Sequence, residues 1–75
     1  MNIIVKILTL ADMGKNRIKI TLKDGTVLVG TAFDAVELDR YDEDGSVLWT
    51  VPIKTADGDT EWADEDLIES VELAE

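Results

Sequence analysis

Polar and apolar residues follow two different periods along this chain. In the first dozen residues the polar positions are spaced four, three and three apart: Asn2, Lys6, Thr9 and Asp12. This spacing places them on one face of a helix, with aliphatic residues on the opposite face. Isoleucine and valine favour a strand by propensity alone. The spacing nevertheless predicts a short helix over residues 2–13, and Gly14 suits a helix stop.

After this segment the period becomes two. Basic residues and threonine alternate with aliphatic residues, which predicts a half-buried strand over residues 17–23 that includes Leu22. The pair Asp24-Gly25 follows, and a second extended apolar run covers residues 26–33. A two-residue Asp-Gly link between such runs predicts a β-hairpin, with positive φ at both central positions of its tight turn.

The remaining strands are short and regularly spaced. Gly30 lies inside the second predicted strand, where we expect a bulge or a sharp bend rather than simple tolerance of glycine. Further strands are predicted at residues 47–53, 60–63 and 67–73, with one helical turn at residues 64–66. One helix followed by about five strands favours a small, strongly bent barrel over an open sheet, because a barrel removes unpaired sheet edges.

The amino-acid composition excludes several kinds of catalytic and metal-binding site. The chain has 75 residues and contains neither cysteine nor histidine. Disulfides, Cys/His zinc sites and catalysis by cysteine or histidine are therefore excluded, as is a hydrolytic triad. The acidic loops do not match the ligand spacing of a helix–loop–helix calcium site. We expect a protein that is not an enzyme, with no cofactor, no metal and no evident small-molecule substrate.

Charge is divided unevenly along the chain, whose net charge is −10. Residues 1–33 carry five basic and two acidic side chains, a net charge of +3, whereas residues 34–75 carry two basic and fifteen acidic ones, a net charge of −13. Such asymmetry either marks an interaction surface or reflects acids that keep a small protein in solution. The large negative charge argues against binding to nucleic acid or to an anionic membrane, because both are negatively charged.

The apolar residues at the start of the chain do not have the pattern of a membrane-spanning segment or a signal peptide. The run over residues 1–11 is about half the roughly 20 residues that span a bilayer. It also lacks the basic start and the cleavage site of a signal peptide. Absence of cysteine fits a reducing compartment, so we expect a cytoplasmic protein with no membrane contact.

The segment from Arg17 to Thr31 (RIKITLKDGTVLVGT), which follows the short helix, resembles the first motif of Sm-like (LSm) proteins. The matching positions are Leu22, Asp24, Gly25, Leu28 and Gly30, then Phe33-Asp34, and residues 66–73 resemble the last strand of the family. The resemblance implies a mainly β fold: a bent, five-stranded, SH3-like barrel capped by the N-terminal helix. It places a single domain over residues 1–75, with the helix at about residues 2–13 and the barrel at about residues 16–74.

The resemblance fails where the family binds RNA. An Asp, a nearby Asn and a basic residue before the last strand line the RNA pocket of the family's rings. Here Phe33-Asp34 follows Gly30 about two residues too soon, Glu37 replaces the Asn, and residues 62–66 are acidic. Carboxylates there would repel a phosphate backbone. The resemblance therefore implies the fold and ring or dimer assembly, without the RNA pocket.

Two functions remain open. The first is a protein-interaction or self-assembly module that binds an unidentified protein or a second copy of itself, since the basic and acidic parts could complement each other. The alternative is RNA binding through a basic stripe on the exposed face of the first strand, formed by Lys15, Arg17, Lys19 and Lys23. The aromatic residues are expected to anchor the core or its rim: Phe33, Tyr41, Trp49 and Trp62.

Overall fold

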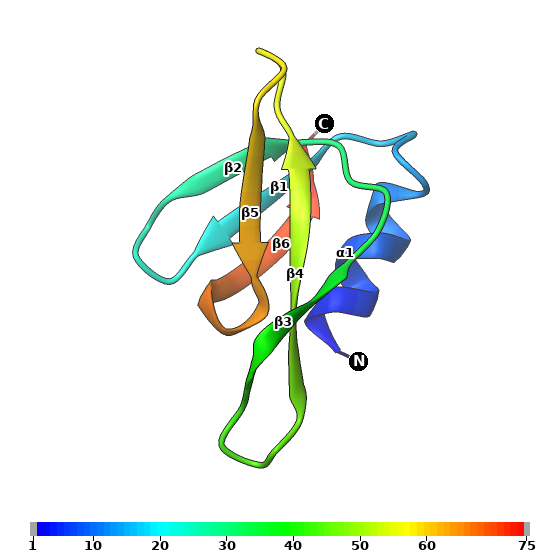
Figure 1. Cartoon of the computed structure of the whole chain (residues 1–75). Helices are drawn as coiled ribbons and strands as arrows, with labels where there is room; N and C mark the ends of the chain where they lie inside the picture. Colours follow the sequence, from blue (N-terminus) through cyan, green and yellow to red (C-terminus); the bar gives the residue numbers. More distant parts are fainter. Residues whose placement is uncertain (1, 75) are drawn as a thin grey trace.

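The structure is a computed structural model that describes residues 2–74. Two three-stranded antiparallel sheets, in the orders β2-β1-β6 and β3-β4-β5, pack with a single α-helix (Figure 1). The elements are α1 (Ile3–Ala11), β1 (Ile18–Leu22), β2 (Val27–Gly30), β3 (Val36–Tyr41), β4 (Val47–Lys54), β5 (Thr60–Asp64), the 3-10 turn η1 (Glu65–Leu67) and β6 (Ile68–Leu73). The chain is thus mainly β with a short N-terminal helix, as the sequence predicts.

Helix α1 forms where the polar spacing predicts it. Its N-cap is Asn2, whose side-chain Oδ1 accepts a hydrogen bond from the Ile4 N–H at 2.7 Å. The helix ends at Asp12, which adopts a left-handed conformation and donates its N–H to the Leu8 carbonyl at 3.1 Å. Burial of Ile4, Ile7 and Ala11 on one face outweighs the strand propensity of isoleucine and valine.

The core lies between α1 and the inner faces of the two sheets. Its largest fully buried side chains come from three elements, α1, β1 and β4: Ile7, Ile18, Ile20, Val51 and Ile53. The alternation predicted for the first strand is therefore correct, although Leu22 at its end is only partly buried. Among the described residues, no helix has the length and apolar character needed to cross a membrane.

The predicted hairpin joins β1 to β2, but its turn differs from the prediction. The Gly25 N–H donates to the Leu22 carbonyl at 2.9 Å, and the Leu22 N–H donates to the Thr26 carbonyl at 2.8 Å. Gly25 has a φ of 92°, whereas Asp24 does not have positive φ. The loop is therefore a three-residue one with a left-handed glycine at its end, and the prediction of two positive-φ positions is wrong.

The same turn is used in all three described hairpins. Gly45 and Gly58 also have positive φ, and each donates its N–H to the carbonyl three residues earlier, at 3.0 Å. In each turn the aspartate before the glycine accepts a hydrogen bond from the backbone N–H two residues further on: Asp24 from Thr26, Asp44 from Ser46 and Asp57 from Asp59. Three of the acids thus have a local structural role.

Of the two roles predicted for Gly30, a bulge or a sharp bend, the structure does not show the bulge. The pairing of Gly30 with Ile18 continues the regular β1–β2 register. A Cβ at Gly30 would lie 2.2 Å from the Lys54 carbonyl oxygen, so glycine is needed for close backbone approach. The next residue, Thr31, bridges to Lys54 through two hydrogen bonds of 3.0 and 2.9 Å. At Gly30 the chain therefore crosses from the first sheet to the second.

The sequence pattern missed β3, so the structure has six strands among residues 2–74 where five were expected. Five of the six residues of β3 are exposed, which leaves no alternation to detect. Its register against β4 also shifts: Glu37 pairs with Trp49, but Tyr41 pairs with Val47. Two extra residues on β3 form a bulge there. The second predicted strand is correspondingly shorter and ends at Gly30.

Candidate functional site

The four predicted basic residues are spread along the first sheet. Lys15 and Arg17, with Asn16 and Leu73, line a cleft of about 300 Å³ beside the end of β6. Lys19 is partly buried in the central strand, with Glu72 of β6 as one cross-strand neighbour. Lys23 lies in the β1–β2 turn, and its charge helps to lower the pKa of Asp66. The structure brings only Lys15 and Arg17 together in a cleft.

The predicted motif residues belong to the fold. Leu22, Asp24 and Gly25 build the first turn, and Gly30 allows the crossing between sheets. The backbone hydrogen bond from Thr26 lowers the pKa of Asp24, because it stabilises the ionised carboxylate. Their chemistry is therefore accounted for by turn geometry.

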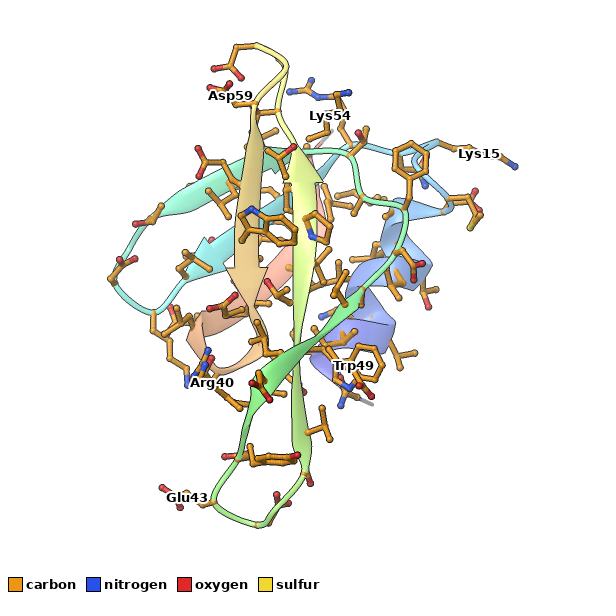
Figure 2. All side chains as sticks on the ribbon, in the orientation of Figure 1. Lys15, Arg40, Glu43, Trp49, Lys54 and Asp59 are labelled. Atoms are coloured by element: carbon orange, nitrogen blue, oxygen red, sulfur yellow. The ribbon has the colours of Figure 1, made fainter. Side chains whose placement is uncertain are left out.

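A second hollow lies between α1 and the second sheet, and sequence reasoning did not identify it. We call it the α1–β4 groove; it has a volume of about 330 Å³ and is lined by Asn2, Ile4, Val5, Leu8, Asp34, Ala35 and Trp49. Figure 2 shows Trp49 beside the first turn of α1. The lining residues come from three separate parts of the chain, so no local sequence motif predicts the groove.

Glu65 fixes one end of this groove. One carboxylate oxygen accepts the Trp49 backbone N–H at 3.1 Å, and the other accepts the Asn2 side-chain Nδ2 at 3.3 Å. Asn2 in turn caps α1. The network connects η1, β4 and the start of α1, and it therefore holds two walls of the α1–β4 groove in place.

Among the described residues that line the groove, Asp34 is the ionisable one. Its Oδ1 accepts the Ala35 N–H at 2.9 Å. Glu37 is exposed and pairs with Trp49 across the sheet. These are the positions at which the Sm-like family would carry pocket residues, and Glu65 lies in the acidic segment before the last strand. Among residues 2–74, no lysine or arginine lines the groove to meet a phosphate.

The bulge in β3 presents a cation to two other acids. The Arg40 guanidinium lies 2.9 Å from Asp66 and 3.2 Å from Asp64. This pairing raises the pKa of Arg40 and lowers the pKa of Asp66, chiefly through the side-chain hydrogen bond between them. Arg40 therefore connects β3 to the β5–β6 connection and is engaged within the fold.

The aromatic residues differ from the prediction. Trp49 is partly buried and packs against the core, as expected. Phe33, Tyr41 and Trp62 are 60%, 68% and 56% exposed, so they are not core residues, and only the prediction of a place at the rim remains open for them. A sheet face in a chain this small has too few neighbouring elements to cover every large side chain.

Comparison with known proteins supports the fold. No family model matches the chain, and neither does any curated protein. Among solved structures it is similar to XC5848 from Xanthomonas campestris, described as adopting a novel variant of the Sm-like motif. The two share 24% identity over 93% of this chain and 80% of that chain, with a TM-score of 0.66. This similarity shows that the chain has an Sm-like fold.

Proposed function

We propose that this protein is a non-enzymatic protein-interaction module whose preferred partner is a basic, extended protein segment. The observation that carries the proposal is the combination of exposed aromatic side chains with an acidic, unpaired strand edge. We further infer that the two sheets, joined by the Thr31–Lys54 bridge and by η1, form the strongly bent, SH3-like barrel expected from the resemblance.

Strand β5 provides the edge. Within the described chain it pairs only with β4, so the backbone groups on its outer side are available to another strand. Trp62 at its centre is 56% exposed and lies opposite Pro52 of β4. Exposed aromatic side chains are enriched at protein interfaces, because they bury a large area at a small loss of side-chain freedom. An added strand would contact Trp62 and continue the sheet.

The charge along the outer strands β5 and β6 disfavours pairing of these two strands between copies. Glu61 belongs to β5, whose other acid, Asp64, is paired with Arg40, and Glu69 and Glu72 belong to β6, an outer strand of the other sheet. Pairing β5 of one copy with β6 of another would place these like charges side by side, which destabilises cross-strand pairs. A lysine- or arginine-rich strand would instead meet opposite charges.

The pKa shifts also fit a role without catalysis. The lowered pKa values belong to turn aspartates and to Asp66, where hydrogen bonds within the fold are the cause. RNA binding remains the second candidate, supported by the cleft that Lys15 and Arg17 line. That cleft is small. The next basic residue along the chain, Lys19, has the acidic Glu72 of β6 as a cross-strand neighbour.

Two measurements test the proposal. Titration of the isotope-labelled protein with a short peptide of alternating lysine and valine should shift the β5 amides at low salt and weaken at high salt. An equivalent glutamate–valine peptide should not bind. Trp62→Ala should weaken binding, whereas Val27→Ala, at another exposed position on β2, should leave it unchanged. Light scattering at low salt should show a monomer.

Other outcomes would overturn the proposal. Salt-independent self-association would favour a second copy as the partner. Salt-sensitive binding of uridine-rich RNA that is lost in Lys15→Glu/Arg17→Glu, together with no peptide binding, would favour the RNA-binding alternative.

A further inference from the structure

We propose that the α1–β4 groove is a binding site for one lysine or arginine side chain presented by a partner. This inference goes beyond the proposed function, because none of the residues that line the groove belongs to β5 and binding there needs no strand addition. The argument depends on the shape of the groove, its apolar walls, the placement of Trp49 and the charge of Asp34.

Size and lining fit a single long side chain. A volume of about 330 Å³ is at the lower end for ligand sites, which span roughly 300–1,000 Å³. Ile4, Val5 and Leu8 of α1 line one side, and Ala35 and Trp49 contribute from the second sheet. Lysine and arginine bury their methylene stems against such walls while the charged end remains near the surface.

Trp49 offers a recognition element that an aliphatic wall lacks. Its ring is partly buried, and its backbone N–H is held at 3.1 Å by Glu65. An ammonium or guanidinium group over an indole face is attracted by the ring quadrupole. Because Glu65 fixes the strand at this point, part of the ordering cost of binding is already met in the free protein.

Asp34 supplies the opposite charge. Its Oδ1 accepts the Ala35 N–H, and among residues 2–74 no hydrogen bond or ion pair involves Oδ2. No lysine or arginine lines the groove. Figure 2 shows Lys15 and Lys54 in the upper part of the view and Trp49 below its middle, and Arg40 is engaged by Asp64 and Asp66.

The helix dipole does not cancel this charge. The positive end of α1 lies near Asn2, and it would disfavour a cation if left alone. Glu65 bonds to Asn2 at that end and provides a compensating negative charge. Among the described residues that line the groove, Asp34 carries the remaining charge, and it would repel a phosphate or carboxylate ligand. A purely apolar side chain would bind without using Asp34.

The test uses blocked tripeptides, N-acetyl and C-amide, in which alanine flanks arginine, lysine, norleucine or glutamate. Norleucine retains the aliphatic stem and lacks the charge. In spectra of the isotope-labelled full chain, the arginine and lysine peptides should shift the Trp49 indole N–H and the amides of Val5, Leu8 and Ala35. The norleucine peptide should bind several-fold more weakly, and the glutamate peptide should not bind.

Matched variants separate this site from general attraction to an acidic surface. Asp34→Asn should weaken the arginine peptide about threefold to fivefold, the range expected for a partly exposed ion pair. Asp39→Asn removes the same charge from an exposed position on β3 outside the groove and should change binding little. Trp62→Ala should also leave the groove shifts unchanged, so failure here is distinguishable from failure at the β5 edge.

Three results would overturn the inference. Equal binding of the norleucine and arginine peptides would show an apolar pocket with no selection for charge. Equal weakening in Asp34→Asn and Asp39→Asn would show non-specific attraction. Absence of shifts around Trp49 while the variants remain folded would exclude the groove as the binding site.

Discussion

Substitution of Gly30 by alanine gives a direct test of how the two sheets meet. The added Cβ would lie 2.2 Å from the Lys54 carbonyl oxygen and 2.8 Å from the Lys54 carbonyl carbon, whereas ordinary contacts begin at 3.4 Å. Both atoms belong to the backbone, so no side-chain rotation relieves the contact. Relief requires the two strands to separate by about 1 Å, which would also stretch both Thr31–Lys54 hydrogen bonds.

The magnitude follows from these two effects. Overpacking costs about 1–3 kcal/mol, and weakening two hydrogen bonds costs about 1 kcal/mol for each. Alanine also restricts the unfolded chain, which returns about 0.4–1 kcal/mol. We therefore expect Gly30→Ala to lower the free energy of unfolding by about 2–5 kcal/mol, a large part of the roughly 4–11 kcal/mol typical of a chain this long.

Urea unfolding followed by circular dichroism measures this loss, with Gly25→Ala as the control. Gly25 has a φ of 92°, and no atom lies within 4 Å of the place that a Cβ would take there. Its alanine variant therefore incurs only the left-handed strain of about 1–2 kcal/mol. The expected order of stability is wild type, then Gly25→Ala, then Gly30→Ala. A Gly30→Ala variant more stable than Gly25→Ala would refute the close approach of Gly30 to Lys54.

Two other predictions concern Thr50 and the turn aspartates. Thr50 is 3% exposed, and its Oγ1 has no hydrogen-bond partner among the described residues. Thr50→Val should therefore raise the free energy of unfolding by about 1 kcal/mol and the midpoint of thermal unfolding by about 4–8 °C. A loss of stability would show that the hydroxyl is satisfied. Hydrogen bonding to Ser46 lowers the pKa of Asp44 from 3.8, so its contribution is present above that value and lost as pH falls through the folded pKa. The difference in urea stability between wild type and Asp44→Ala should narrow below pH 3.8, and a difference independent of pH would contradict this assignment.

Some elements could be predicted because their burial follows a single period. Helix α1 buries Ile4, Ile7 and Ala11, and β1 buries Ile18 and Ile20, so helical and strand periods are each visible in the sequence. The hairpin was also predictable from Asp24-Gly25, but the turn type was not. Loop length depends on which residue pair closes the ladder, and that is decided by the β1–β2 register.

In β3 and β6, bulges disrupt the alternation of buried and exposed residues by which a strand is recognised in a sequence. In β3 the register shift between Glu37 and Tyr41 coincides with a strand that exposes nearly every residue. The register between β1 and β6 also shifts, because Thr21 pairs with Ser70 but Leu22 pairs with Ile68. The two buried residues of β6, Ile68 and Val71, are therefore three positions apart. A period of three resembles neither a regular strand nor a convincing helix, and alternation could not assign either strand's faces.

The candidate groove could not be predicted because its residues are distant in sequence. Residues 2–8, 34–35 and 49 meet only when α1 packs beside the second sheet. The Sm-like resemblance singled out Asp34 and the acidic segment that contains Glu65, but it gave them no new role. Only the hydrogen bonds from Trp49 and Asn2 show that Glu65 organises the groove.

The division of charge along the chain acquires a structural meaning once individual acids are placed. Asp44 and Asp57 stabilise turns, Glu65 holds α1 to β4, and Asp64 and Asp66 bind Arg40. These acids have partners within the fold and are less available to a ligand. Other acids lie along β5 and β6, in the β3–β4 and β4–β5 turns and at Asp34, which are separate surfaces. A basic partner could therefore engage an edge and the α1–β4 groove together, whereas a second copy that paired β5 with β6 would bring two acidic strands into contact.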